Sequence, residues 1–337
     1  MTIYTGGSAS VSWGVESTFN TAVTATNIFG VQQKISSFSL TNNRIDLNKL
    51  GQVETACYAY GQQAGSISIG FIFDNTDSHK IFESIYGAAS GGDGTVGTPF
   101  LYPATNAQGA TSPSVTSLTT LVQLQTGADT LKRSLTGCIV NSLGISTSIG
   151  ETVNGTVDMS FAKEDNAAVL TSTDTITQQD DVSLDQGAKP YTFAHGVVNI
   201  STGGVDAATE VADVQDIDIT FAQNAEMLYG IGSNYSVDAF RRVLEVTGRF
   251  RAVWRNDNLL QHVIDQIRSS EEVLNYGATS GVGLELTFTN GVNIIKIELN
   301  DLGVGDHNVT GIEPVEPVFE EINFKAKHAR LTITVGA

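Results

Sequence analysis

A short segment near the start of the chain recurs, with the same internal spacing, 183 residues further on. Residues 65–79 read GSISIGFIFDNTDSH, and residues 248–262 read GRFRAVWRNDNLLQH. Both begin with glycine, continue through alternating apolar residues, and reach Asp-Asn and then His at the same distances. A signature that is repeated in this way predicts two copies of one structural unit.

Four further matches lie in the same order around this pair. They are SFSLT (37–41) with DIDIT (216–220), Leu47 and Gly51 with Leu228 and Gly232, NSLGI (141–145) with NDLGV (300–304), and Phe161 with Phe324. The offset falls from 183 to 159 before the NSLGI match, which predicts an insertion of 24 residues in the first copy. Segment 90–114, rich in Gly, Ser and Thr, is the expected insertion and reads as a surface loop. We therefore predict tandem units at 1–175 and 176–337, with the boundary near 171–189.

The signature predicts a strand that leads into a short helix. Apolar residues alternate at Ile67, Ile69 and Phe71, and again at Phe250, Ala252 and Trp254. The Asp-Asn pairs that follow would cap the helices, because their side chains accept hydrogen bonds from first-turn amides. These predicted caps are Asp74 and Asn75 in the first copy and Asp257 and Asn258 in the second. Behind them, Leu260, Val263, Ile264 and Ile267 have helical spacing, and Ile81, Phe82 and Ile85 form the matching face.

The rest of the chain reads as strands. Alternating or β-branched runs occur at 197–201, 216–221, 284–288, 294–299 and 330–335. We expect a mainly β protein made of two tandem β-sandwich or barrel domains, each with one short α-helix.

Composition excludes several classes of function. The net charge is −18, with 7 basic and 12 acidic residues in 1–170 and 11 and 24 in 171–337, so phosphate-neutralising nucleic-acid binding is not expected. No apolar run is long enough to span a membrane, and the first residues carry no secretory signal, so we expect no membrane insertion. Cys57 and Cys138 could pair or stay free.

Catalytic and metal-binding motifs are absent. The chain has no GxSxG, HExxH, GxxxxGK or CxxC motif. Asp74 with His79, and Asp257 with His262, offer too few ligands for zinc, and helix capping is the simpler interpretation. The acidic segments 74–77 and 301–308 could hold calcium, although ordinary turns explain them better. We predict no catalytic residue, no metal and no cofactor.

Five arginines form the one basic cluster in this acidic chain: Arg241, Arg242, Arg249, Arg251 and Arg255. On a solvated face, pairs with acidic residues would contribute only about 0–1 kcal/mol each. Against an acidic surface of another subunit, bidentate pairing would fix the register of the contact. Both interpretations stay open, and the second predicts an inter-subunit role.

Several longer segments resemble the tail tube subunits of long-tailed viruses. The resemblance is carried by GCIVNSLGISTSIGETVNGTVDMSF (137–161), YTFAHGVVNIS (191–201), DIDITFAQN (216–224) and FEEINFKAKHARLTITV (319–335). It implies β domains that assemble side by side into sixfold rings, which stack into a tube that delivers the genome. The inner tube of a contractile injection machine is similar. A different class, an acidic duplicated β-sandwich acting as a binding or surface-layer module, is the alternative.

With two such domains per chain, three chains would close a pseudo-sixfold ring. The resemblance then implies a virion tail protein, assembled in the host cytoplasm, whose partners are itself, other tail proteins at the tube ends, and viral DNA that passes without specific binding.

Residues that face the channel are predicted from the strand 216–221. If Ile217, Ile219 and Phe221 face the core, Asp216 and Asp218 lie on the opposite face, with Ser37 and Ser39 as the matching first-copy positions. Acidic side chains there would repel DNA over about 8 Å at physiological salt. The competing interpretation puts these aspartates on the outer surface, where they would only add solubility.

Overall fold

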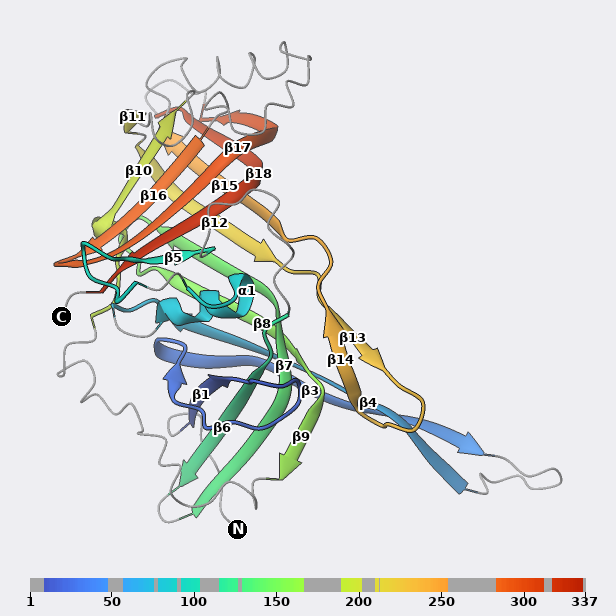
Figure 1. Ribbon diagram of the computed structural model, residues 1–337. Coiled ribbons are helices and arrows are strands. Elements are labelled where there is room, and N and C mark those ends of the chain that lie inside the picture. Colours follow the sequence, from blue (N-terminus) through green and yellow to red (C-terminus); the bar gives the residue numbers. More distant parts are fainter. Residues whose placement is uncertain are drawn as a thin grey trace.

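The computed structural model describes residues 9–47, 57–75, 78–89, 92–103, 115–126, 129–166, 189–201, 210–211, 213–253, 283–311 and 317–335. These residues are mainly β, as predicted, with one short α-helix (Figure 1). We call 9–166 the first half and 189–335 the second half. The first half contains β1 (Ala9–Val15), β2 (Asn27–Ile28), β3 (Val31–Leu47), β4 (Cys57–Ile72), the 3-10 helix η2 (Ser78–Phe82), α1 (Glu83–Tyr86), β5 (Phe100–Tyr102), β6 (Leu118–Thr126), β7 (Asp129–Ser148), β8 (Asn154–Phe161) and β9 (Lys163–Asn166).

The second half includes all five strands predicted there. It contains the 3-10 helix η3 (Phe193–His195), β10 (Gly196–Ser201), β11 (Glu210–Val211), β12 (Val214–Ala222), β13 (Glu226–Tyr229), β14 (Ser236–Phe240), β15 (Glu245–Val253), β16 (Gly283–Asn290), β17 (Asn293–Thr310) and β18 (Phe319–Thr334). The second-copy helix predicted after Asp257 lies outside the described residues.

Both halves have the same antiparallel strand order. The first half runs β2-β1-β6-β7-β8-β4-β3, and the second runs β11-β10-β16-β17-β18-β15-β12. The chain also enters these positions in the same succession in both halves: β1, β2, β3, β4, β6, β7 and β8 correspond in turn to β10, β11, β12, β15, β16, β17 and β18. A ladder between β7 and β12 joins the two halves into one sheet.

Two cross-strand registers coincide with the sequence matches. Phe38 lies opposite Ile67 in the β3–β4 ladder, and the matched Ile217 lies opposite Phe250 in the β12–β15 ladder. Gly65 lies opposite Phe161 between β4 and β8, and the matched Gly248 lies opposite Phe324 between β15 and β18. The offsets 179, 183 and 163 read from the sequence therefore describe equivalent positions in the two ladders.

The match between NSLGI and NDLGV is wrong in register. Leu143 lies opposite Val157, whereas Leu302 lies opposite Ala326, which is six residues beyond the counterpart of Val157 at offset 163. The ladders instead align β7 with β17 at an offset of 166: Thr136 opposite Lys163 corresponds to Leu302 opposite Ala326. A short Leu-Gly pattern occurs easily by chance in strands of this composition, so it carried little positional information.

Glycine and phenylalanine face each other across the sheet in both halves. A Cβ placed on Gly65 would lie 2.0 Å from Phe161 Cζ, and one on Gly248 would lie 2.4 Å from Phe324 Cζ. The ring thus occupies the space that a side chain would need, an arrangement that also fixes strand register. This packing explains why both signatures begin with glycine.

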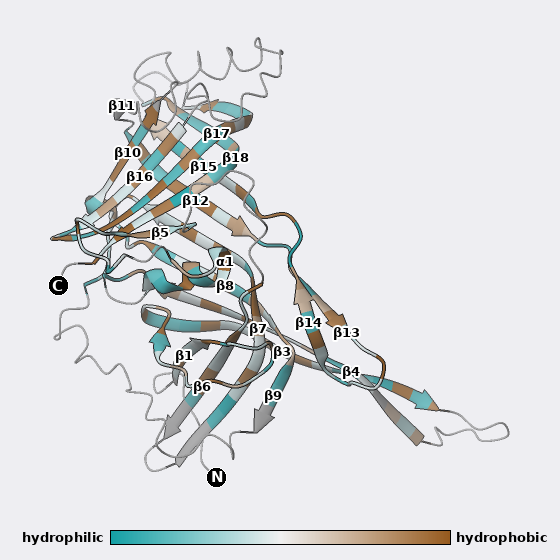
Figure 2. Ribbon diagram, viewed as in Figure 1, coloured by the Kyte–Doolittle hydropathy of each residue, from teal (hydrophilic) through white to brown (hydrophobic). Residues whose placement is uncertain are grey.

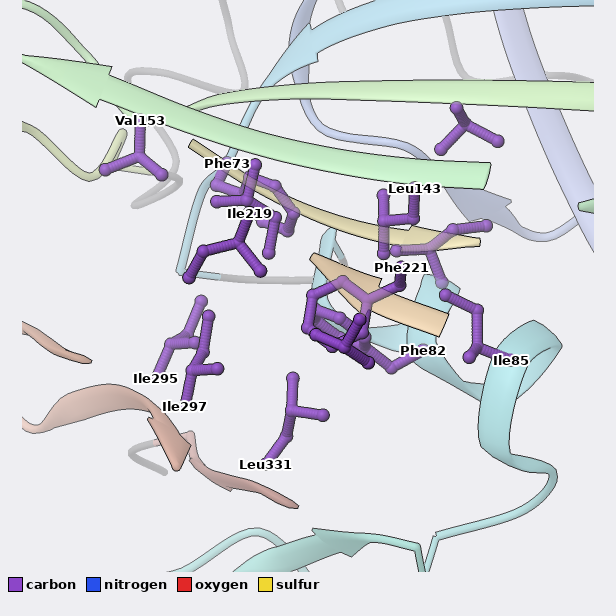
Figure 3. Packing of buried hydrophobic residues seen from close by; sticks show 14 of the residues in the cluster. Phe73, Phe82, Ile85, Leu143, Val153, Ile219, Phe221, Ile295, Ile297 and Leu331 are labelled. Carbon is purple, nitrogen blue, oxygen red and sulfur yellow. The ribbon is translucent and has the colours of Figure 1, made fainter. Parts of the chain in front are cut away.

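The core is one continuous cluster that runs through both halves. Hydrophobic residues alternate with hydrophilic ones along the strands (Figure 2), so each strand turns one face to this cluster. Figure 3 shows the centre, where Phe221 of β12 lies against Phe82 of the first half. Their ring centroids are 5.8 Å apart, and Phe221 also meets Tyr86 of α1 at 6.4 Å. Ile81, Phe82 and Ile85 are buried, as their predicted helix face requires.

The expectation that segment 90–114 is only a surface loop is wrong for its described residues, 92–103. Its strand β5 pairs with β18 of the second half, with Tyr102 opposite Leu331. Tyr102 is 1% exposed, and its ring lies 6.3 Å from that of Phe82. Segment 92–103 therefore closes part of the core with one aromatic side chain, which its Gly- and Thr-rich composition concealed.

Candidate assembly surfaces

The face of the sheet opposite the core carries the predicted channel residues of the second half. Ile217, Ile219 and Phe221 are buried, whereas the side chains of Asp216 and Asp218 are 23% and 45% exposed. Arg249 Nη2 lies 2.6 Å from an Asp218 carboxylate oxygen and 3.8 Å from one of Asp216. Its Nη1 also lies 3.7 Å from Glu321 on β18. The two aspartates are therefore part of a mixed-charge network and not an isolated acidic pair.

Acidic and basic side chains are equal in number on this face. Cross-strand pairing and alternation across β12, β15 and β18 place four carboxylates and four cations on it: Asp216, Asp218, Glu245 and Glu321 with Arg249, Arg251, Lys325 and Lys327. Lys325 Nζ contacts Glu245 at 2.8 Å. The hydrogen bond with Asp218 is the main cause of a raised pKa for Arg249, and the nearby carboxylates raise it further. Arg249 therefore stays charged.

The counterpart face of the first half has few charges. Ser37 lies opposite Ser68 and Ser39 opposite Ser66, at the positions that Asp216 with Arg251 and Asp218 with Arg249 occupy in the second half. Both Ser37 and Ser39 are exposed. On β8, Asp158 accepts a hydrogen bond of 2.8 Å from Ser142 Oγ. Serine hydroxyls thus replace the ion pairs of the second half.

The four described arginines of the basic cluster all have contacts within the chain. Arg242 pairs with Glu226, and Arg249 pairs with Asp218. Arg241 Nη1 donates a 2.6 Å hydrogen bond to the Ile85 carbonyl, and the Arg251 guanidinium lies 4.2 Å from the Phe319 ring centroid. Carboxylates of the same chain therefore balance Arg242 and Arg249, and the inter-subunit role of the cluster stays a prediction. Arg255 lies outside the described residues.

The junction between the halves is a regular antiparallel ladder. Residues Ser142–Ser148 of β7 pair with Asp216–Ala222 of β12, for example Gly144 with Thr220 and Ile145 with Ile219. Gln223 Nε2 supports the junction by donating to the Ser84 carbonyl at 2.8 Å. β3, the first-half counterpart of β12, pairs with β4 on one side, and among the described residues no strand pairs with its other side.

Two hairpins project from equivalent positions. The distal part of the β3–β4 hairpin, residues 40–47 and 57–65, forms an arm that extends away from the rest of the molecule in Figure 1. Large apolar side chains lie exposed on the arm at Leu40, Ile45, Leu47 and Tyr58. Its second-half counterpart, β13–β14, rests on β4: Gln63 N–H donates to the Asn234 carbonyl at 2.8 Å, and Tyr229 Oη donates to the Gln63 carbonyl at 3.1 Å.

The predicted helix caps are only partly described. Asp74 is fully buried and precedes η2 by four residues; its N–H donates to Ser78 Oγ, which donates to the Asp74 carbonyl at 2.8 Å. Asn75 Oδ1 accepts from the Lys189 N–H at 2.7 Å. Capping by these side chains stays a prediction, and Asp257 and Asn258 lie outside the described residues.

The described residues contain no group of three or more side chains that could hold a metal ion. His79 is buried with its ring stacked on Phe100, and His262 lies outside the described residues. Segment 301–308 is part of β17 and not a free turn. Cys57 is exposed and Cys138 buried, and both are free thiols. No helix in the part of the chain that the structure describes has the length and apolar character to cross a membrane.

A comparison with protein families adds the deciding observation. The model of the phage tail tube protein family matches residues 6–326, which is nearly the whole chain. The chain belongs to the phage tail tube protein family. No curated protein matches it. As a phage tail tube protein, it is a structural component of the virion tail and not an enzyme.

Sequence reasoning missed the junction strand and the arm of this tail tube protein. The signal for the arm was present: Ile45 and Leu47 alternate with polar residues at the end of β3, beyond the part of the strand that covers the core. The role of β7 at the junction had no comparable signal, because pairing partners far apart in sequence leave no mark on either strand.

Proposed function

We propose that three copies of this chain close a ring of six tube-like units and that the rings stack into a hollow tail tube through which viral DNA passes. The proposal is supported by the common strand order and the coincident registers of the two halves. It treats the halves as duplicated copies joined side by side by the β7–β12 ladder. Such a ring repeats this junction six times and pairs the free side of β3.

The proposed channel wall is the polar face of the sheet. Its first-half part carries serines and its second-half part carries a nearly balanced set of acids and bases, so the wall has no excess of cations. DNA affinity rises with each phosphate that a protein neutralises. A wall whose arginines are already held by carboxylates lets a polyanion pass without binding it. Charge balance, and not the strong acidic repulsion expected from the sequence, would then keep DNA from binding, because Arg249 offsets part of the charge of Asp216 and Asp218.

Electron microscopy and native mass spectrometry of the purified protein test the ring. The expected particles have six lobes, threefold symmetry and the mass of three chains. Particles with six full chains in one ring would contradict the duplicated arrangement, and dispersed monomers under all assembly conditions would refute the tube itself.

A matched pair of charge variants tests the wall. Asp216→Lys with Asp218→Lys, and separately Ser37→Lys with Ser39→Lys, place cations at equivalent positions in the two halves. Both should give assembled tubes a salt-dependent affinity for DNA that unaltered tubes lack. The serine variant breaks no ion pair, so it controls for damage to the fold. If both variants assemble and neither gains DNA affinity, this face does not line the channel.

The remaining partners follow from the same proposal. We propose that other tail proteins bind the two ends of the tube and that assembly takes place in the host cytoplasm. A place in the inner tube of a contractile machine would use the same ring, and no described feature favours a surface-layer module.

A further inference from the structure

The internal β7–β12 junction provides a template for the contact between chains. β12 is held on one side by β15 and on the other by β7, which belongs to the preceding half. β3 occupies the equivalent place in the first half and is held by β4. Among the described residues no strand pairs with the other side of β3, and in the proposed ring a second copy supplies the strand that completes it.

The ladders identify that strand and its register. β17 is the second-half counterpart of β7 at an offset of 166, and β3 is the counterpart of β12 at an offset of 179. In the template, Ser142 lies opposite Ala222 and Gly144 opposite Thr220. Adding 166 to the first member of each pair and subtracting 179 from the second gives Asn308 opposite Asn43 and Thr310 opposite Thr41. Asn308 and Thr310 pair with β18 on one side, and Asn43, Thr41, Asn308 and Thr310 are all exposed.

The two hairpins support the same arrangement independently. β13–β14 projects from the second half and rests on β4 of the preceding half through Gln63. The arm projects from the equivalent point of the first half and carries exposed Ile45, Leu47 and Tyr58. In the proposed ring, an equivalent seat on another copy would cover these exposed apolar side chains.

We infer that the outer edge of β3 pairs antiparallel with the end of β17, residues 308–310, of a neighbouring copy, in the register Thr41–Thr310 and Asn43–Asn308. The inference rests on the proposed ring and adds to it the pair of strands and their alignment. It also orients the subunits head to tail, with the first half of each chain beside the second half of the next.

Cysteine cross-linking in a Cys57→Ser background tests this register. Thr41→Cys with Thr310→Cys should be joined by a short bismaleimide, shifting the protein from monomer to dimer and trimer bands on denaturing gels. Ser37→Cys with Thr310→Cys is the matched control, because four residues along a strand separate the thiols by about 13 Å. Gly144→Cys with Thr220→Cys is the positive control and should cross-link within one chain, since a Cβ on Gly144 would have its nearest neighbour at 3.9 Å, an ordinary van der Waals contact.

Electron micrographs of the same samples separate the possible failures. Rings with the Thr41–Thr310 cross-link and without the Ser37–Thr310 cross-link support the inference. Rings in which the control pair reacts instead, or in which neither pair reacts, overturn the register while leaving the proposed tube intact. A complete absence of rings from the unaltered protein refutes both.

Discussion

Replacing Gly65 by alanine should destabilise the free subunit by crowding a single aromatic ring. The new Cβ would lie 2.0 Å from Phe161 Cζ, whereas carbon atoms in contact sit about 3.5–4.0 Å apart. The ring therefore has to move by roughly 1.5 Å, and it has little room, because Phe161 is 1% exposed and packs against Phe38 at 5.7 Å. Overpacking of this kind costs about 1–3 kcal/mol.

Urea unfolding of the unassembled subunit measures this cost, and Gly70→Ala is the control in the same strand. The nearest atom to a Cβ on Gly70 is 3.9 Å away, so that variant should be neutral or stabilised by about 0.4–1 kcal/mol. Phe161→Leu removes the crowded ring atom. Gly65→Ala combined with Phe161→Leu should therefore be less destabilised than the sum of the single variants, with a coupling of about 0.5–3 kcal/mol. Equal stability of the Gly65→Ala and Gly70→Ala variants, or strict additivity in the cycle, would refute the packing argument.

Four further predictions address other parts of the molecule. Tyr102→Ala should lower the unfolding free energy by about 3–5 kcal/mol, and a loss below 1 kcal/mol would return segment 92–103 to the status of a surface loop. Native protein should react with maleimide at Cys57 alone, as counted by mass spectrometry, because Cys138 is buried and burial raises the pKa of its thiol to about 12; two labels before unfolding would contradict this. Ile45→Asp should leave the free subunit within about 0.5 kcal/mol of the unaltered stability but abolish rings, whereas Val292→Asp, also exposed and in the turn between β16 and β17, should keep both the stability and the rings; rings from Ile45→Asp would exclude the arm from assembly. Burial raises the pKa of Glu320 above its ordinary value of 4.5, with His307 opposing the shift, so the protein loses stability as the pH rises from 4.5 through the raised pKa. Glu320→Gln should therefore gain stability relative to the unaltered protein from pH 4.5 upward, and a stability difference that does not change with pH would contradict the raised pKa.

The sequence pattern was enough to predict the strands and to identify several equivalent positions in the two halves. The alternation in DIDITF places Ile217 and Ile219 in the core, and the recurrence of Gly65 and Phe161 as Gly248 and Phe324 reflects a real contact between strands. Both signals can be read without knowing which strands pair, since one is an alternation with a period of two and the other is a repeated spacing between matching segments.

Features that depend on long-range pairing could not be predicted. β5 has three residues, too few for any periodicity, and its burial depends on β18, more than 200 residues away. The partners of Arg249 are set by the register of β12, β15 and β18, so their network was invisible in a list of charges. A β-bulge also adds one residue to a strand and so changes the pairing partner of every later residue; the ladders of β7 with β8 and of β17 with β18 both contain such register shifts.

In the proposed ring, the β7–β12 ladder means that each chain joins the assembly with one of the contacts between units already formed. Two separate subunits lose translational and rotational freedom when they meet, at a cost of about 4–15 kcal/mol. Partners on one polypeptide avoid that loss, because each holds the other at an effective concentration in the millimolar range or above. In a ring of three such chains, half of the contacts form during folding, and only three arrivals complete a layer. Tube growth would then have a lower kinetic order in protein concentration than growth from single-unit subunits, and it would start at lower concentrations.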